Sequence, residues 1–188
     1  MTVDVVFLHG AGDGAHDEDA ALVESLVAHL GDGFRVAYPR LPEDDAADER
    51  WLDAIGASLA GSEGPLAVVG HSAGGYLLLK HLATARVDRR ILAIGILAAP
   101  FPGGDDDWTF DGFDLPDDLG DRLPSGARVL LYAAEDDEVV PFAHRDLYAA
   151  AIPQALTRTL TGGHRFGGDL GGVAEDLRAL VSLSAPEE

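Results

Sequence analysis

The sequence predicts an α/β fold in which a mainly parallel sheet of about six strands carries helices on both faces. Short apolar runs rich in Val, Ile and Leu recur along the chain and are typical of strands buried on both faces. Longer stretches with apolar residues at helical spacing separate these runs, as right-handed crossovers require. At 188 residues the chain is long enough for one well-buried core and too short for two ordinary domains. We therefore expect a single domain over residues 1–188.

Six apolar runs are the predicted strands. The first leads directly into a glycine-rich turn, the second is stopped by Pro39, and the third leads into another tight turn. In chain order, these strands are residues 3–8, 34–38, 66–69, 91–97, 129–132 and 156–160. Because parallel strands end at the same edge of a sheet, ligands should bind beyond their carboxyl ends.

Five segments with apolar residues at helical spacing are the predicted helices. The first has acidic residues in its first turn and Gly31 after its end, which are typical helix boundaries. The second carries Trp51, Ile55 and Leu59 on one face. In chain order, the helices are residues 17–30, 51–59, 76–82, 143–151 and 174–183. Residues 100–124 are rich in Gly, Pro and Asp and are expected to form one long irregular loop.

The formal net charge is −20, from 33 acidic and 13 basic residues. Such a charge repels nucleic acids and anionic membranes, so neither is expected as a partner. Dense carboxylates also keep a protein soluble in concentrated salt, which favours a salt-adapted source. No apolar run reaches the roughly 18 residues that a membrane span needs, and no signal-type segment begins the chain. We therefore expect a cytoplasmic protein.

The chain contains no cysteine, so covalent catalysis would need another nucleophile. Ser72 is the candidate, because residues 70–74 (GHSAG) match Gly-x-Ser-x-Gly between a predicted strand and a predicted helix. Gly70 and Gly74 permit the close backbone contacts of this strained turn because neither has a Cβ atom. The pattern alone also fits a simple connecting turn, but its position after an apolar strand favours a nucleophile.

A reacting carbonyl needs hydrogen-bond donors where its negative charge develops, and two backbone N–H groups usually supply them. The N–H of Ala73, directly after the nucleophile, is the first candidate. The second should come from the turn after the first strand, residues 9–12 (HGAG), and we expect it to be Ala11, with Gly12 as the alternative.

The base that activates Ser72 should be a histidine, because its side chain takes and returns protons near neutral pH. Of the seven histidines, His164 is favoured because it follows the last predicted strand, in a loop expected to be flexible. The remaining histidines fall in helices, in an early loop or within the turn of the nucleophile, where surface or packing roles are expected. They are His9, His16, His29, His71, His81 and His144.

The histidine in turn needs a carboxylate that fixes its tautomer and stabilises its cation. Residues 135–138 (EDDE) follow the fifth predicted strand, which is where this acid is expected in the order Ser, Asp, His. We favour Asp137, because it precedes an apolar turn that can shield it from water. Asp136 remains the alternative.

Together these motifs resemble the α/β-hydrolase superfamily over nearly the whole chain. The length, and Trp108 and Phe110 in the loop before the fifth strand, are similar to the small retinoblastoma-binding-protein and bacterial YdeN-like serine hydrolases. The resemblance implies a minimal α/β-hydrolase fold without a cap domain. It also implies a triad of Ser72, His164 and Asp137 that uses no metal or other cofactor.

The expected activity is hydrolysis of an ester or other acyl bond in a small molecule through an acyl-enzyme intermediate. An anionic phosphate- or nucleotide-bearing substrate is disfavoured by the charge of the chain. Residues near the reacting groups, and aromatic residues of the long loop that could instead pack in the core, are candidates for contacting the substrate. They are His9, Gly10, His71, Trp108, Phe110 and Phe113.

Two other functions use the same residues differently. A cofactor-free perhydrolase or haloperoxidase would use the same triad with peroxide in place of water. A binding protein would keep the fold without turnover. The filled triad positions favour an enzyme, and the oligomeric state stays open.

Overall fold

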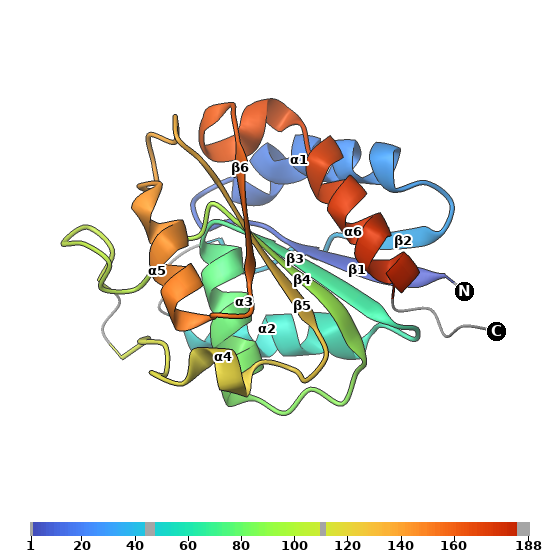
Figure 1. The fold of residues 1–188 in the computed structure, drawn as a ribbon, viewed down its shortest axis with the longest axis horizontal. Coiled ribbons are helices and arrows are strands. Elements are labelled where there is room, and N and C mark those ends of the chain that lie inside the picture. Colours follow the sequence, from blue (N-terminus) through green and yellow to red (C-terminus); the bar gives the residue numbers. More distant parts are fainter. Residues whose placement is uncertain (1, 44–47, 110–111, 184–188) are drawn as a thin grey trace.

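The structure is a computed structural model that describes residues 2–43, 48–109 and 112–183. In these residues six strands form one parallel sheet in the order β2-β1-β3-β4-β5-β6 (Figure 1). The strands are β1 Val3–Leu8, β2 Phe34–Ala37, β3 Leu66–His71, β4 Ile91–Leu97, β5 Arg128–Ala134 and β6 Leu156–Leu160. Strand order reverses after β2, so β1 and β3 lie side by side at the centre of the sheet.

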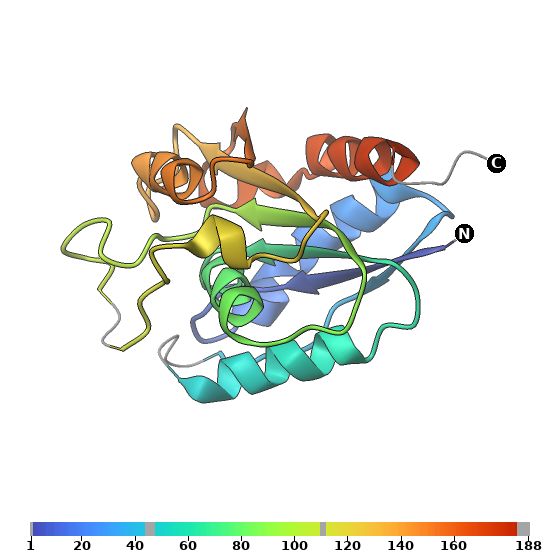
Figure 2. The ribbon, with the colours of Figure 1, turned by 60° about the horizontal axis from the view of Figure 1, so that its bottom comes forward.

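Helices connect successive strands and cover both faces of the sheet (Figure 2). Their bounds are α1 Ala15–Leu30, α2 Glu49–Ala60, α3 Ala73–Thr84, α4 Leu119–Arg122, α5 Ala143–Ala151 and α6 Gly171–Leu183, with a 3₁₀ helix η1 at Gly163–Gly168. Alternate side chains of each strand point to opposite faces. The sheet therefore has two separate apolar cores, one against α1 and α6 and the other mainly against α2 and α3.

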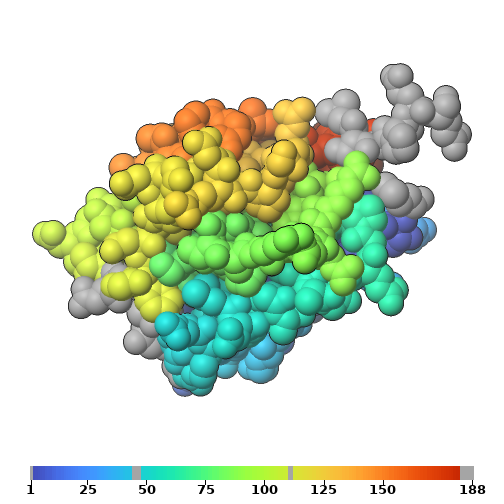
Figure 3. All heavy atoms as spheres, turned by 90° about the horizontal axis from the view of Figure 1, so that it is seen from below, coloured from blue at the N-terminus to red at the C-terminus, as the bar shows by residue number. Residues whose placement is uncertain are grey.

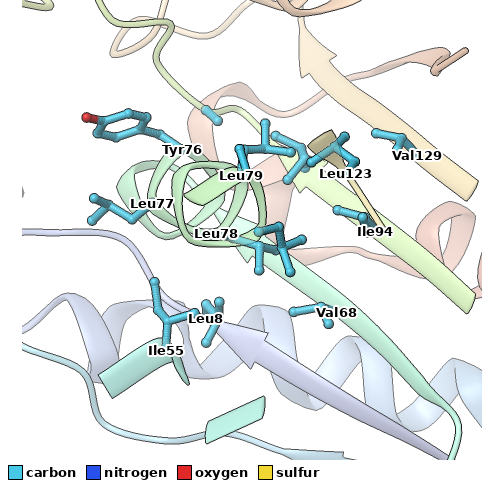
Figure 4. Packing of buried hydrophobic residues seen from close by; sticks show 14 of the residues in the cluster. Leu8, Ile55, Val68, Tyr76, Leu77, Leu78, Leu79, Ile94, Leu123 and Val129 are labelled. Carbon is cyan, nitrogen blue, oxygen red and sulfur yellow. The ribbon is translucent and has the colours of Figure 1, made fainter. Parts of the chain in front are cut away.

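Helix α3 lies deep in the second core, which explains its sequence. Its run Tyr76, Leu77, Leu78 and Leu79 is fully buried, so the helix is apolar on more than one side. Figure 4 shows Leu78 and Leu79 on the side of the labelled strand residues, with Ile55 of α2 below the helix, whereas Tyr76 points away from the strands. Because α3 begins directly after Ser72, this packing fixes the position of that residue.

The segment between β4 and β5 is more ordered than the sequence predicts. It contains the short helix α4, and Phe113 is buried in the core beside α3. The Tyr76 hydroxyl donates to the Phe113 carbonyl, and the Lys80 Nζ lies 5.0 Å from the centre of the Phe113 ring. Figure 3 shows this face, with the yellow part of the segment beside green α3. Phe113 is therefore a core residue, and Phe110 lies outside the described residues.

Other differences from the predicted elements concern their ends. Strand β3 continues two residues beyond the predicted end to His71, and α3 begins at Ala73, so a single residue separates them. Helix α1 begins at Ala15 rather than residue 17, after Gly14 in a left-handed conformation. None of the helices in the described ranges combines the length and the apolar character needed to cross a membrane.

Candidate active site

Ser72 is the single residue between β3 and α3 and has a strained backbone, with φ 52° and ψ −128°. A positive φ is costly for a residue with a Cβ atom, and such strain is concentrated at functional sites. The neighbouring glycines make the turn possible. A Cβ on Gly70 would lie 2.6 Å from the Cα of Gly75, and one on Gly74 would collide with the carbonyls of Leu8 and His9. This geometry is that of a nucleophile elbow.

The turn after β1 lies against this elbow. A Cβ on Gly10 would lie 3.1 Å from the Ser72 Cβ and 3.6 Å from its Oγ, so Gly10 leaves the space beside the hydroxyl open. Its N–H is occupied, because it donates to Asp19 Oδ2 at 3.0 Å. Gly10 therefore lies beside the nucleophile but does not offer a free donor there.

The same turn distinguishes between the two candidates for the second oxyanion donor. The Gly12 N–H already donates to the carbonyl of Glu43 at 2.7 Å. No described residue accepts a hydrogen bond from the N–H of Ala11, which is exposed. Ala73 is the first residue of α3, where N–H groups have no partner within the helix. The geometry is therefore compatible with Ala11 and Ala73 as the two donors.

His164 and Asp137 form a buried pair at the carboxyl edge of the sheet. The His164 Nδ1 donates to Asp137 Oδ2 at 2.9 Å, and the Asp137 side chain is only 1% exposed. The other oxygen of this carboxylate accepts from the N–H groups of Val139 and Val140 at 2.8 and 3.0 Å. Burial raises the pKa of Asp137, but these hydrogen bonds and the nearby His164 outweigh burial, so its pKa is lowered. The carboxylate therefore stays ionised and can orient the ring.

The alternative acid, Asp136, has a different position. Its exposed carboxylate accepts from the Gly162 N–H at 3.1 Å, and so holds the turn that precedes His164. Hydrogen bonds from the N–H groups of Gly163 and Gly162 lower its pKa. Glu135 and Glu138 point to solvent. Of the four acids, Asp137 is thus the one paired with the histidine ring.

His164 does not lie in the flexible loop that the sequence predicts. It is the second residue of the 3₁₀ helix η1, which begins at Gly163 directly after Gly162, and both glycines have a positive φ. Within the described residues no hydrogen bond joins Ser72 Oγ to the His164 ring, although this ring lies 4.8 Å, centroid to centroid, from that of His71. Catalytic hydrogen bonds are often long without substrate and shorten when it binds. The structure thus brings His164 close to the elbow without a hydrogen bond between its ring and Ser72.

Asp19 is a site residue that the sequence analysis missed. Its side chain is 1% exposed and lies beneath the elbow, where Oδ2 meets the Gly10 N–H at 3.0 Å and His71 Nδ1 at 2.7 Å. Its other oxygen accepts from Arg165 Nε at 3.2 Å. Burial alone would raise the pKa of Asp19, but these hydrogen bonds and the charge of His71 lower it to about 2. One carboxylate therefore links α1, the turn after β1, the elbow and η1.

The sequence did contain a signal for Asp19. It lies three, seven and eleven positions before Leu22, Leu26 and Leu30, on the apolar face of the predicted helix. An acidic residue on a buried helix face needs a partner. All three acids of this turn fit a favourable interaction with the helix dipole, so the sequence pattern by itself did not single out Asp19 as the one that points inward.

His9 and His71 were expected to contact substrate, and the structure corrects this. Their exposures are 0% and 1%, and both nitrogens of each ring are hydrogen-bonded. In this structure neither side chain is open to a substrate. Trp108 lies in a turn held by Asp105, which accepts from its N–H at 3.2 Å.

The remaining histidines have surface or packing positions, as expected. His144 and His81 are buried, and His16 stacks on Tyr38 with ring centroids 4.3 Å apart. His29 is exposed on α1. Within the described part of the chain, no three His, Asp or Glu side chains are grouped as metal ligands would be.

A parallel sheet with a nucleophile elbow after its third strand and a carboxylate–histidine pair at its carboxyl edge defines the α/β-hydrolase fold. The comparison with protein families agrees, because residues 5–183 match the alpha/beta hydrolase family. The chain therefore belongs to this family, and the predicted fold class is confirmed. No domain is inserted as a cap in the described residues.

Solved structures extend this likeness. The ydeN gene product from B. subtilis has a TM-score of 0.73 and 20% identity over 96% of this chain and 98% of that one. The esterase domain of a Rhodothermus marinus protein has a TM-score of 0.67 and 18% identity over 94% and 85%. A structure described with the metagenome-derived lipolytic enzymes LipS and LipT has a TM-score of 0.69 and 18% identity over 96% and 94%. At these identities the likeness concerns the fold. No curated protein sequence matches the chain at a significant level.

Proposed function

We propose that this protein is a serine hydrolase that cleaves an ester or other acyl bond in a small molecule, with Ser72 as nucleophile. The observation that carries the proposal is the pairing of His164 with a buried, ionised Asp137 at the sheet edge where the strained Ser72 lies. Family membership supports hydrolase activity, and neighbours described as esterases and lipolytic enzymes favour an acyl substrate.

In the first half of the reaction, His164 Nε2 takes the proton of the Ser72 hydroxyl as Oγ attacks the substrate carbonyl. The carbonyl oxygen becomes an oxyanion and receives hydrogen bonds from the N–H groups of Ala11 and Ala73. As the tetrahedral intermediate collapses, the bond to the leaving group breaks and His164 returns its proton to that group. The acyl part of the substrate is then esterified to Ser72.

In the second half, His164 takes a proton from a water molecule, which attacks the acyl-enzyme carbonyl. Collapse of this intermediate returns the proton to Ser72 Oγ and releases the carboxylic acid. Asp137 holds the ring in the tautomer with a proton on Nδ1 and stabilises the cation that forms twice in each cycle. The cycle balances without a cofactor, and the net charge of −20 favours neutral or cationic substrates.

A fluorophosphonate probe tests this proposal, because it forms a stable bond with an activated serine. The probe should label the wild-type protein at Ser72 and should not label Ser72→Ala. A series of p-nitrophenyl esters of increasing acyl length, assayed at low and molar salt, then gives the substrate preference. A folded wild-type protein that the probe does not label and that hydrolyses none of these esters would contradict the proposal.

A further inference from the structure

A second carboxylate–histidine pair lies directly beneath the candidate active site. His71 and Asp19 are 2% and 1% exposed at their side chains, and His71 Nδ1 lies 2.7 Å from Asp19 Oδ2. The other ring nitrogen, Nε2, lies 2.9 Å from the backbone carbonyl oxygen of His164. The mechanism above uses neither side chain.

The partners of this ring determine its protonation. A backbone carbonyl can only accept a hydrogen bond, so Nε2 of His71 must carry a proton. The Asp19 carboxylate also faces Gly10 and Arg165, which are both donors, so it too is an acceptor and Nδ1 must carry a proton. A ring that donates from both nitrogens is an imidazolium.

Two other buried histidines show the contrast. Nε2 of His9 accepts from the Leu41 N–H, and its Nδ1 donates to the Gly10 carbonyl. Nδ1 of His144 accepts from the Phe101 N–H, and its Nε2 faces Asp105. Each of these rings meets one donor and one acceptor, which suits a neutral imidazole. Among these three buried rings, only that of His71 faces acceptors on both sides.

We propose that His71 is an imidazolium, paired with Asp19, that positions the catalytic base. The proposal rests on the function proposed above. The imidazolium holds the carbonyl of His164, and Asp19 holds the N–H of Gly10, so one buried ion pair sets both the base and the turn that carries the oxyanion donor Ala11. His71 and Asp19 are thus positioning residues.

The charged groups around the pair support this assignment. Helix α1 contributes Asp19 and Glu18, and η1 contributes Arg165 and His164. Arg165 bridges the two acids, donating to Asp19 from Nε and to Glu18 from a terminal nitrogen. Arg165, the second cation, therefore contacts Oδ1 of Asp19. Oδ2 is left for His71 and Gly10. Removing either partner would leave a buried uncompensated charge, which is strongly unfavourable.

Nitrogen-15 NMR of the histidine rings tests the protonation state directly. At neutral pH the His71 ring should show two protonated nitrogens, while His9 and His144 show one protonated and one bare nitrogen. The signals are assigned by their loss in His71→Gln, or in His9→Gln and His144→Gln. A neutral His71 ring in the wild-type protein would overturn the proposal, whatever the variants do.

The variant Asp19→Asn tests the positioning role. The amide keeps the size of the side chain but can donate to Nδ1, so the His71 ring should become neutral and keep its proton on Nε2. We expect kcat to fall by about 100-fold, as expected for a slightly misplaced base, with a smaller change in KM. An Asp19→Asn protein with wild-type kcat would contradict the positioning role.

The matched control is Asp4→Asn. Asp4 is also buried, and it also accepts from backbone N–H groups and an arginine, but it lies at the amino edge of the sheet. This variant should keep wild-type kcat and the imidazolium signature of His71. If the proposed function fails, the fluorophosphonate probe leaves the wild-type protein unlabelled while the ring signature stays. If only the present proposal fails, His71 is neutral in a protein that the probe labels.

Discussion

Within the described residues the site contains two carboxylate–histidine pairs of nearly the same local geometry, one fully buried (His71–Asp19) and one partly buried (His164–Asp137). Nδ1 of His164 lies 2.9 Å from Asp137, and Nδ1 of His71 lies 2.7 Å from Asp19. They differ at the opposite ring nitrogen. Nε2 of His71 is bound to a carbonyl, whereas Nε2 of His164 has no hydrogen-bond partner among the described residues.

Because of this difference, the His164 ring can exchange protons at Nε2, whereas the His71 ring is hydrogen-bonded at both nitrogens and can only hold its neighbours in place. Both rings meet a carboxylate oxygen at Nδ1. Only a nitrogen open to the reacting atoms can take up a proton and return it. The environment of the second nitrogen, rather than the presence of an acid, therefore distinguishes the proposed base from its support.

The largest expected effect on turnover comes from removing the ring of His164, the proposed base. His164→Ala should lower kcat for ester hydrolysis by about 10⁴-fold or more while the protein remains folded. The measurement is steady-state hydrolysis, with circular dichroism as the check on folding. Wild-type turnover by folded His164→Ala would show that the two pairs are not distinguished in this way.

The second-largest loss of kcat is expected when Asp137, the partner of His164, is replaced. Asp137→Asn should lower kcat by about 10³- to 10⁴-fold, because the amide no longer fixes the correct tautomer of His164. The neighbouring Asp136→Asn is the control and should cost at most about tenfold, since it weakens one exposed hydrogen bond to Gly162. Equal losses in the two variants would argue against Asp137 as the specific partner.

The free energy of unfolding should fall more when the acid of the His71–Asp19 pair is replaced than when the acid of the His164–Asp137 pair is replaced. Asp19→Asn is expected to lower the free energy of unfolding by about 3 kcal/mol, because it removes the carboxylate that compensates the buried cation of His71, whose ring must then lose its proton. Asp137→Asn should cost less, because its pair with His164 is only partly buried, whereas the pair of Asp19 with His71 is fully buried. Urea denaturation of both variants at neutral pH measures this difference, and the reverse order would contradict it.

Because the pKa of Asp19 is lowered on folding, the free energy of unfolding should depend on pH in the acidic range. Its pKa is about 2 in the folded protein and has a usual value of 3.8, so the folded state favours the ionised carboxylate. This contribution, about 2 kcal/mol, is fully present above pH 4 or so and is lost as the pH falls towards about 2. The stability difference between the wild-type protein and Asp19→Asn should therefore shrink over this acidic range in urea titrations. A constant difference would be inconsistent with a lowered pKa.

The smallest effect is expected at the turn after β1, whose Gly10 N–H donates to Asp19. Gly10→Ala would place a Cβ 3.1 Å from the Ser72 Cβ and 3.6 Å from its Oγ, which is crowded but not impossible. We expect kcat/KM to fall by about tenfold, mainly for bulky acyl groups, because the added methyl occupies space beside the nucleophile. An unchanged preference across acyl lengths would show that substrates approach from another side.

The sequence predicts the sheet well because each strand depends on local information. Continuous apolar runs such as Ile91–Leu97 mark strands whatever surrounds them, and all six predicted strands overlap the observed ones. The glycine pattern around Ser72 predicts the elbow for the same reason. Parallel pairing follows from the helical connections.

What the sequence analysis missed depends on contacts between distant residues. Asp19 and His71 are 52 residues apart, and the carbonyl that binds His71 is 93 residues further on. No local pattern specifies that these groups meet. The 3₁₀ helix η1 was missed likewise, because Gly162 and Gly163 predict a flexible turn, whereas in the structure the Gly162 N–H donates to Asp136 and the His164 carbonyl accepts from His71.

The parallel sheet also has a practical consequence for handling the protein. Strand β1 begins at Val3, at the edge opposite to Ser72, and runs about 20 Å before it reaches the turn at Gly10 (Figure 1). A tether fused ahead of β1 would thus anchor the molecule by its inert end. Beads or electrodes coated in this way should present the Ser72 of each attached molecule outward, towards the substrate solution.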